Sequence, residues 1–305
     1  MITALAGGVG AAKFLTGLAT LVKQEDLSVI VNTGDDIELF GLHISPDIDI
    51  VAYTLAGIVD ERKGWGIKDD SFHCLEMLKK YGLETWFSLG DRDLATHIHR
   101  SDLLRKGFTL SQVTNEFVQA LGLKVKLFPM TNDKFETRIR TNKGLVHFEE
   151  YLVRNQAKDE VVGTEFVGAN AAKPAMGVVE AIMNSRLIIV CPSNPIVSIG
   201  TILAVNGVKD ALQRTNAKVV AVSPIVAGAP IKGPADKLFR GLGLEVSAFG
   251  VAKLYADFAD VFVIDVLDVE QKSRIEDLGF KVKVTNTVMK SFADKVRLAK
   301  IVLED

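Results

Sequence analysis

Carboxylates gather in two short segments near the start of the chain. The segment Asn32-Thr33-Gly34-Asp35-Asp36 is followed closely by Ser45-Pro46-Asp47-Ile48-Asp49. If these side chains lie together, they suit Mg²⁺, which prefers hard oxygen ligands and usually takes one or two protein carboxylates plus substrate phosphates. Turn chemistry is the alternative, with Asp47 capping a helix that begins near Ile50. We favour the metal site because a glycine loop accompanies it.

That glycine loop is Gly7-Gly8-Val9-Gly10, followed by Ala11-Ala12-Lys13. Glycines let backbone N–H groups approach a phosphate, and a helix N-terminus and Lys13 add favourable charge. The spacing matches neither Gly-x-Gly-x-x-Gly nor Gly-x-x-x-x-Gly-Lys-Ser/Thr. A tight turn without a ligand is the alternative. Because the loop closes a strand and opens a helix, Gly7, Gly8, Gly10 and Lys13 are candidate phosphate contacts.

A third polar segment runs from Leu89 to His97 and reads Leu-Gly-Asp-Arg-Asp-Leu-Ala-Thr-His. On a helix, Asp93, His97 and Arg100 share one face. Asp91 or Asp93 would cap that helix, but caps do not explain the whole set. A lone histidine is usually structural, so this segment alone does not make His97 a general base.

A rigid loop, Pro192-Ser193-Asn194-Pro195, follows a predicted buried strand. Its side chains and carbonyls are able to read the edge of a nucleobase, although an ordinary strand-to-helix turn is the alternative. Similar loops follow at Ser223-Pro224-Ile225 and at residues 228–236, which contain Lys232. Three such loops on successive strands favour a common cleft.

The elements that carry these segments predict an α/β fold. Residues 2–6, 11–22 and 27–31 form a strand–helix–strand unit, which implies a parallel sheet. Further strands at 187–191, 218–222 and 261–264 are continuous apolar runs, typical of strands covered on both faces. Helices are expected at 174–184 and 206–214. We therefore predict a three-layer α/β/α Rossmann-like core with a mainly parallel sheet, whose ligands lie at the carboxyl ends of the strands.

The middle of the chain has a different pattern. Residues 70–81 and 109–121 predict amphipathic helices, and residues 122–155 are rich in strand signals, with alternation at 136–140 and 145–151. We interpret residues 60–165 as a smaller mixed α+β insertion lobe, and residues 1–60 and 165–305 as the nucleotide-binding core.

Composition excludes several classes of protein. The 305 residues carry a net charge of −2, which argues against binding nucleic acid by general charge. We find no apolar run long enough for a membrane span and no signal peptide, and two cysteines cannot build a disulfide scaffold. We expect a cytoplasmic enzyme or binding protein. Motifs of serine hydrolases, zinc proteases and kinases are absent, which favours direct transfer between bound substrates aided by a metal.

Together, these segments resemble a known family, the CofD/FbiA family of 2-phospho-L-lactate transferases of coenzyme F-420 biosynthesis. The resemblance covers nearly the whole chain. It rests on the ordered segments Gly-Gly-Val-Gly-Ala-Ala-Lys at 7–13, Asn-Thr-Gly-Asp-Asp at 32–36, Ser-Pro-Asp-Ile-Asp at 45–49, Gly-Trp-Gly at 64–66, Leu-Gly-Asp-Arg-Asp-Leu-Ala-Thr-His at 89–97, Pro-Ser-Asn-Pro at 192–195 and Ser-Pro-Ile at 223–225.

The resemblance implies transfer of a phospholactyl or phosphoenolpyruvyl group from a guanosine diphosphate-linked donor to the deazaflavin Fo, with Mg²⁺ required and GMP released. It implies a homodimer. It also suggests roles for single residues: Asp35 as metal ligand, Asp49 as contact to Fo or metal, Asp91, Arg92 and His97 around Fo, and Ser193 and Asn194 around the guanosine. Ser88 departs from the lysine that some members carry, which puts a cation there in doubt.

Two other classes remain open. The YvcK-like regulators resemble the same family in fold and glycine loop, bind a nucleotide sugar and transfer nothing. A Rossmann dehydrogenase is the third, and it lacks support because the full glycine fingerprint is missing. The segment at 89–97 and the pair Asp35 and Asp49 favour the transferase. Nothing in the sequence distinguishes lactate, enolpyruvate and glycerate as the acid on the donor.

Overall fold

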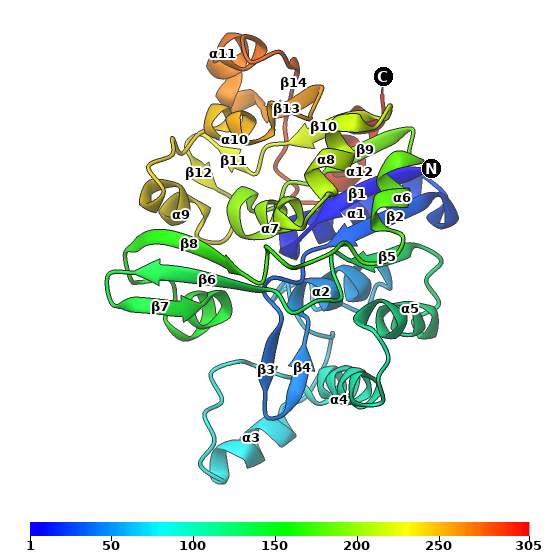
Figure 1. Cartoon of the computed structure of the whole chain (residues 1–305), viewed down its shortest axis with the longest axis vertical. Coiled ribbons are helices and arrows are strands. Elements are labelled where there is room, and N and C mark those ends of the chain that lie inside the picture. Colours follow the sequence, from blue (N-terminus) through cyan, green and yellow to red (C-terminus); the bar gives the residue numbers. More distant parts are fainter. Residues whose placement is uncertain (305) are drawn as a thin grey trace.

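The centre of the protein is a seven-stranded parallel sheet (Figure 1). The structure is a computed structural model that describes residues 1–304. The strands lie in the order β14 (Lys281–Thr285), β13 (Val261–Asp265), β10 (Lys218–Val222), β9 (Leu187–Val190), β1 (Ile2–Ala6), β2 (Leu27–Val31) and β5 (Lys126–Pro129).

Successive residues of the central strands enter two different hydrophobic cores. Leu5 and Ile30 pack into the core on one face of the sheet. Their neighbours Ala4, Val29 and Val31 pack into the core on the other face. Because both faces are covered, these strands are apolar throughout instead of alternating. The predicted Rossmann-like three-layer core is confirmed.

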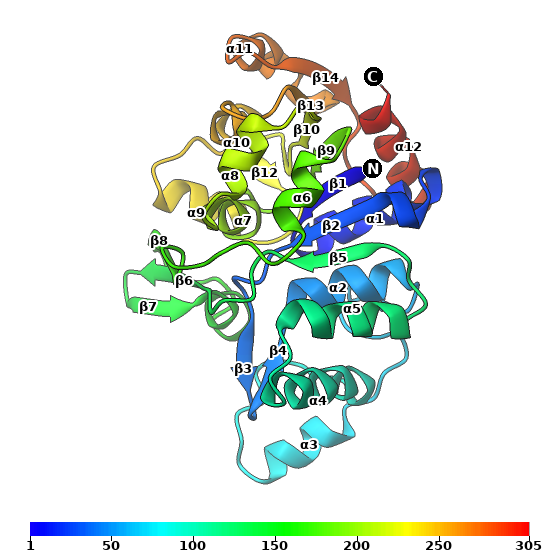
Figure 2. The ribbon, with the colours of Figure 1, turned by 45° about the vertical axis from the view of Figure 1, so that its right-hand side comes forward.

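Helices supply the outer layers, as Figures 1 and 2 show. One core receives buried residues from α1 (Gly8–Leu21), α2 (Pro46–Leu55), α5 (Leu110–Ala120) and α12 (Phe292–Leu303). The other receives them from α6 (Val178–Met183), α7 (Gly200–Ala204), α8 (Val208–Arg214), α9 (Ala235–Gly241), α10 (Ala248–Tyr255) and α11 (Lys272–Glu276). Short 3₁₀ segments are η1 (Gln24–Asp26) and η4 (Val266–Gln271), and π-helical turns are η2 (Glu150–Arg154) and η3 (Pro195–Ile199).

Three small antiparallel sheets and two further helices lie outside the central sheet. They are the hairpin β3 (Ile37–Leu39) and β4 (Leu42–Ile44), the sheet β7 (Gly144–His147), β6 (Glu136–Thr141) and β8 (Val161–Val167), the hairpin β11 (Ile225–Val226) and β12 (Ala229–Pro230), and the helices α3 (His73–Lys80) and α4 (Asp91–Arg105). Helix α3 lies at the lower tip of the molecule beside α4 (Figure 2). The boundaries of the lobe at residues 60 and 165 stay a prediction, and within that range β5 belongs to the central sheet.

Several predicted boundaries change. Helix α1 begins at Gly8, inside the predicted glycine turn. Helix α2 begins at Pro46 and not near Ile50, so Asp47 lies in its first turn, where proline fixes the backbone for a helix start. Residues 150–151 are π-helical and not extended.

The strand order creates a switch point in the sheet. From β1 the chain crosses to β2 on one side, and it later returns to form β9 on the other side of β1. The loops after β1 and β9 therefore leave the same sheet edge in different directions, and such divergence opens a crevice for a ligand.

Among the described residues, no single helix is long and apolar enough to cross a membrane. The helices Pro195–Ala204 and Val208–Arg214 reach that length and hydropathy only when they are taken together, and they meet at an angle of 85°.

Candidate active site

A cavity of about 570 Å³ lies at this switch point. Its lining includes the loops that follow β1 and β9 and the first turn of α2. All the predicted site residues line it except Asp91 and Arg92. Those that do are Gly7, Gly8, Gly10, Lys13, Asp35, Asp49, His97, Ser193 and Asn194.

The glycine loop holds two strand ends together. A Cβ on Gly10 would lie 2.3 Å from the carbonyl oxygen of Pro192, so only glycine allows this approach. The backbone N–H of Gly7 donates to Ser193 Oγ at 3.2 Å. Gly8 has a φ of +68°, which favours glycine at the start of α1. The N-terminus of α1 therefore lies directly beside the Pro192–Pro195 loop.

Asp35 and Asp47 form a buried carboxylate group around one amide. Asn32 Nδ2 donates to Asp35 Oδ2 at 3.0 Å and to Asp47 Oδ2 at 2.9 Å. Asp35 Oδ1 is buried without a hydrogen-bond partner. Glu149 also lines the cavity and is buried. Among the described residues, no lysine or arginine forms an ion pair with any of these three carboxylates.

Burial without a cation shifts these groups toward their neutral forms. Burial and, to a smaller extent, repulsion from Asp36 raise the pKa of Asp47 to about 7. Hydrogen bonds from Asn32 and Gly8 act in the opposite direction but do not cancel this rise. Burial and the nearby Asp47 and Asp36 raise the pKa of Glu149 to about 8. Burial, Asp47 and Glu149 also raise the pKa of Asp35 well above its usual range. A divalent cation would relieve both the desolvation and the repulsion.

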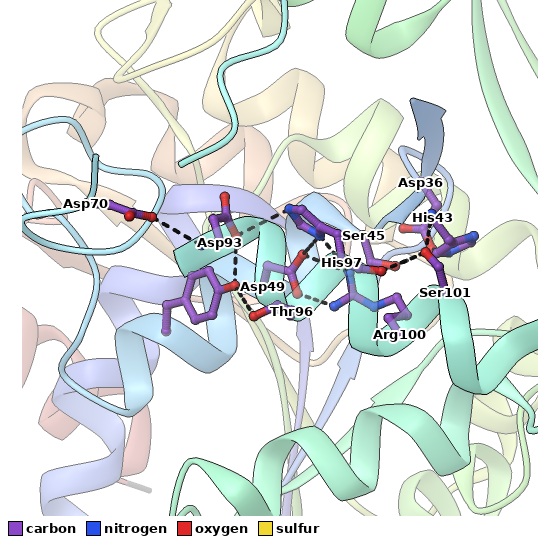
Figure 3. Close-up of polar contacts among 11 residues, drawn as sticks. Asp36, His43, Ser45, Asp49, Asp70, Asp93, Thr96, His97, Arg100 and Ser101 are labelled. Atoms are coloured by element: carbon purple, nitrogen blue, oxygen red, sulfur yellow. Dashed lines mark hydrogen bonds and ion pairs between the residues drawn. The ribbon is translucent and has the colours of Figure 1, made fainter. Parts of the chain in front are cut away.

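A second buried group contains Asp49, Asp93, His97 and Arg100 (Figure 3). Arg100 Nη1 donates to Asp49 Oδ2 at 3.0 Å, and Arg100 Nη2 donates to Asp49 Oδ1. Arg100 Nη1 also lies 3.3 Å from His97 Nδ1. The sequence prediction that Asp93, His97 and Arg100 share one helix face is confirmed, because all three are buried on the same side of α4.

The two groups differ in how their charge is balanced. One ligand atom each from Asp49, Asp93 and His97 lies within 4.8 Å of the others, which is compact enough for a metal ion. However, Arg100 already contacts both oxygens of Asp49 and supplies the positive charge there. The cation-free carboxylates are those of Asp35, Asp47 and Glu149. The pairing of Asp35 with Asp49 as metal ligands stays a prediction, and the geometry places Asp47 beside Asp35.

Asp36 does not line the cavity and instead fixes the β3–β4 hairpin. Its Oδ2 accepts from Ser45 Oγ at 2.7 Å and lies 2.9 Å from His43 Nε2. The backbone N–H of His43 donates to Ser101 Oγ of α4 at 2.7 Å (Figure 3). These contacts tie the hairpin to both α2 and α4, which carry the second group.

Asp91 at the start of α4 caps α3, and Asp70 in the segment before α3 caps α4. Asp91 Oδ1 and Oδ2 accept the backbone N–H groups of Cys74 and His73, which open α3. Asp70 accepts the backbone N–H groups of Arg92 and Asp93, which open α4. The prediction that Asp91 or Asp93 caps α4 is therefore wrong, because the capping carboxylate comes from a different segment.

Two lysines without acidic partners stand beside the glycine loop. Lys13 of α1 and Lys232 of the loop after β12 both line the cavity, and neither forms an ion pair within residues 1–304. Burial and the charge of Lys13 lower the pKa of Lys232. A pair of cations at a helix N-terminus favours an anion such as a phosphate.

The loop after β9 offers hydrogen-bonding groups to the cavity. Asn194 Oδ1 accepts from the backbone N–H groups of Ile196 and Val197, at 3.0 and 3.3 Å. Its Nδ2 makes no hydrogen bond to a described residue. The amide is thus held rigidly with its donor side available.

Aromatic side chains form the remaining wall. Tyr53, Trp65, Phe87 and Phe148 line the cavity and give it an apolar part beside its charged groups. Trp86 packs edge-to-face on Phe87 and is not part of the lining. A flat conjugated ligand fits this kind of wall.

Sequence reasoning misses Glu149 and assigns no role to Lys232 or Arg100. Glu149 arrives from the segment after β7 and has no motif around it, so no signal marked it. Lys232 was noted only as a lysine in a small-residue loop, and the glycines and prolines around it were the available signal. Arg100 was placed on the correct helix face, but its bidentate contact with Asp49 depends on α2 packing beside α4.

The fold and cavity define a doubly wound α/β protein with a ligand site at its switch point. The family model of 2-phospho-L-lactate transferase CofD matches residues 2–297. The chain is 42% identical to the 2-phospho-L-lactate transferase of Methanocaldococcus jannaschii, over 100% of this chain and 97% of that protein. It is 43% identical to the phosphoenolpyruvate transferase of Streptomyces coelicolor, over 98% and 96% of the two chains. The chain belongs to the CofD family of transferases.

A solved structure shows the same fold. A member of the UPF0052 family from Bacillus halodurans superposes with a TM-score of 0.66, covering 99% of this chain and 98% of its own, at 15% sequence identity. At that identity the likeness concerns the fold alone.

Proposed function

We propose that this protein transfers a phospholactyl or phosphoenolpyruvyl group from a guanosine diphosphate-linked donor to the deazaflavin Fo. The terminal ribityl hydroxyl of Fo attacks the phosphorus that bears the acid, the P–O bond to GMP breaks, and GMP leaves. The product is coenzyme F-420-0 or its dehydro form. The observation that carries the proposal is one cavity that joins a phosphate loop, an aromatic wall and two buried carboxylate groups in a CofD-family chain.

The donor is assigned to the glycine-loop end of the cavity. We assign Asn194 Nδ2 and the hydroxyl hydrogen of Ser193 to the guanine edge, because the Ser193 oxygen already accepts from Gly7. The N-terminus of α1 with Lys13 and Lys232 suits the diphosphate. Fo is assigned to the aromatic end, against Tyr53 and Phe87, with its polar tail toward the second carboxylate group.

Mg²⁺ is proposed as the cofactor, and the donor set supports it. Asp35, Asp47 and Glu149 offer hard oxygen atoms, lack a protein cation, and include the unsatisfied oxygen Asp35 Oδ1. Asp49 is less suited because Arg100 donates hydrogen bonds to both of its oxygens. When bound, Mg²⁺ would offset charge on the phosphates. The homodimer and the cytoplasmic location stay predictions.

The test is to incubate the protein with Fo, Mg²⁺ and guanosine diphosphate-linked lactate or enolpyruvate. Mass spectrometry should detect the new phosphodiester, and GMP should appear in equal amount. The ratio of the two rates identifies the preferred acid. Absence of product with both donors, together with calorimetric binding of a uridine nucleotide sugar, would favour the non-catalytic regulator instead.

A further inference from the structure

Asp93 presents one carboxylate oxygen to the protein and the other to the cavity. Its Oδ1 accepts from the hydroxyl of Tyr53 at 2.7 Å, and His97 Nε2 lies 3.3 Å from the same oxygen without hydrogen-bond geometry. Its Oδ2 accepts no hydrogen bond from a described residue, and Asp93 lines the cavity. In Figure 3, one oxygen of Asp93 lies on the dashed line to His97, and the other oxygen points away from His97.

The neighbouring groups are already engaged. Both oxygens of Asp49 accept from Arg100. His97 Nδ1 faces Arg100 Nη1 at 3.3 Å, and because arginine only donates, Nδ1 is the acceptor. The other ring nitrogen of His97, Nε2, then carries a proton and lies 3.3 Å from Asp93 Oδ1 without hydrogen-bond geometry. In this group, Asp93 Oδ2 is thus the basic atom that remains available to a ligand.

We propose that Asp93 is the general base of the transfer reaction, an assignment that rests on the proposed function. As the acceptor hydroxyl oxygen bonds to phosphorus, its O–H bond breaks and the proton moves to Asp93 Oδ2. The P–O bond to GMP breaks at the same time, and its electron pair leaves with GMP. No oxidant or further reactant is needed.

The surroundings hold the carboxylate in place for this step. The backbone N–H of Asp93 donates to Asp70 Oδ2 at 3.1 Å, which fixes the first turn of α4. The titratable and charged groups around Asp93 are Tyr53 and Asp49 of α2, His97 and Arg100 of α4, and Asp70 of the segment before α3. Arg100 balances the charge of Asp49 within this group.

The experiment compares three variants with the wild type. Asp93→Asn keeps an acceptor for Tyr53 and removes the base. Asp93→Glu keeps the carboxylate. Asp102→Asn is the matched control, because Asp102 lies on the same helix, has a side chain that is 47% exposed and pairs with Lys106. For each variant, kcat and KM for Fo are measured across pH, Fo binding is followed by fluorescence titration, and thermal unfolding checks the fold.

We expect Asp93→Asn to lower kcat by about 10²- to 10⁴-fold, the range for loss of a general base, with Fo binding changed by less than about threefold. With Mg²⁺ held at saturation at every pH, so that metal binding does not limit the rate, the pH profile of kcat should differ between this variant and the wild type. Asp93→Glu should recover part of the activity, and Asp102→Asn should match the wild type.

Other outcomes overturn the assignment. A kcat within a few-fold of wild type and an unchanged pH profile in Asp93→Asn would remove Asp93 from the proton transfer. Equal losses in Fo binding and kcat would make it a binding residue. If Asp93→Asn does not fold, a pH profile of Asp93→Glu identical to the wild type would also count against it. A wild type without turnover would instead refute the proposed function.

Discussion

Asp35 is a buried carboxylate with one unsatisfied oxygen, and we propose it as a ligand of Mg²⁺. Asp35→Asn keeps its size and removes its charge. We expect the apparent affinity for Mg²⁺ to fall by at least about tenfold, because even second-shell changes at metal sites cause losses of that order. Steady-state rates across a Mg²⁺ titration measure this, and excess Mg²⁺ should restore part of the activity.

The control for this variant is Glu38→Gln, three residues away in β3 and exposed. Unchanged activity of Asp35→Asn at limiting Mg²⁺ would exclude Asp35 as a ligand.

The raised pKa values of Asp47 and Glu149 predict how stability depends on pH. Their usual pKa values are 3.8 and 4.5, and in the folded protein they titrate near 7 and 8. Between these limits the folded state holds protons that the unfolded state has released. The metal-free protein should therefore lose stability as pH rises from 5 to 8.5, by at most about 1.4 kcal/mol per group and pH unit. Differential scanning calorimetry in EDTA measures this loss.

Mg²⁺ should reverse the trend. Because it binds the deprotonated carboxylates, its stabilising effect should grow with pH and be small at pH 5. The double variant Asp47→Asn with Glu149→Gln should show a flatter pH dependence and little response to Mg²⁺. A metal-free protein that is more stable at pH 8.5 than at pH 5 would show that other groups dominate.

At the scale of residues, the motifs predicted most of the cavity lining, because turn residues after buried strands converge at one sheet edge. They did not predict the division of carboxylates into two groups. Asp47 and Asp49 are two positions apart on α2 and point to different partners, Asn32 and Arg100. That division depends on how α2 packs against β2 and α4, which no local pattern records.

At the scale of elements, the loop that follows β12 brings Lys232 to the N-terminus of α1. Lys232→Gln should weaken GDP binding by about 10- to 100-fold, the range for losing a hydrogen bond to a charged group. Binding of guanosine, which lacks phosphates, should not change. Calorimetry with both ligands separates the two effects.

Lys272→Gln on α11 is the control, because Lys272 pairs with Glu276 away from the cavity. Equal weakening of guanosine and GDP would mean that Lys232 supports the loop and not the phosphates.

The reciprocal caps predict a structural role for Asp91. Asp91→Ala removes the acceptor for three donors of the segment that opens α3, from Ser71, His73 and Cys74. Amide hydrogen exchange in α3 should accelerate, while exchange in α5 stays unchanged.

Because Asp91 and Arg92 do not line the cavity, Arg92→Ala should leave KM for Fo within about twofold of the wild type, well below the change expected from losing a buried contact.

A large rise in KM for Fo in Arg92→Ala would show instead that the side chain reaches the acceptor. That result would restore the sequence-based assignment of Arg92 to the Fo site.

The elements that the sequence predicted well are those with strong local signals. Strands β1, β2 and β10 occur at the predicted residues, because continuous apolar runs end at turn residues. The edge strands β5 and β14 were not singled out. Strand β14 reads Lys-Val-Lys-Val-Thr, and its alternation with lysine resembles an exposed segment, since an edge strand buries less of its surface.

At the scale of the whole molecule, both faces of the central sheet are packed against helices. We therefore expect that substituting either of two adjacent core residues in a strand destabilises the protein to a similar extent. Ile188 packs into one core and its neighbour Ile189 into the other, both fully buried. Changing either to alanine should lower the free energy of unfolding by about 2–5 kcal/mol. Val162→Ala in β8, where the side chain is 50% exposed, should stay within about 0.5 kcal/mol. Chemical denaturation measures all three.

A sheet that tolerated Ile188→Ala but not Ile189→Ala would have only one packed face.

The position of β1 has a consequence for how the chain folds as it is synthesised. One edge of β1 pairs with β2 at once, but the other must wait for β9, which sets Ile2 beside Leu187. Pairing of segments so distant in sequence is slow, because a long loop must close first. Until then, an N-terminal intermediate carries Asp35, Asp47 and Glu149 but no Pro192–Pro195 loop, and an edge of β1 is open to another chain. Ribosome-bound chains stopped before residue 187 should therefore bind chaperones that recognise exposed strands.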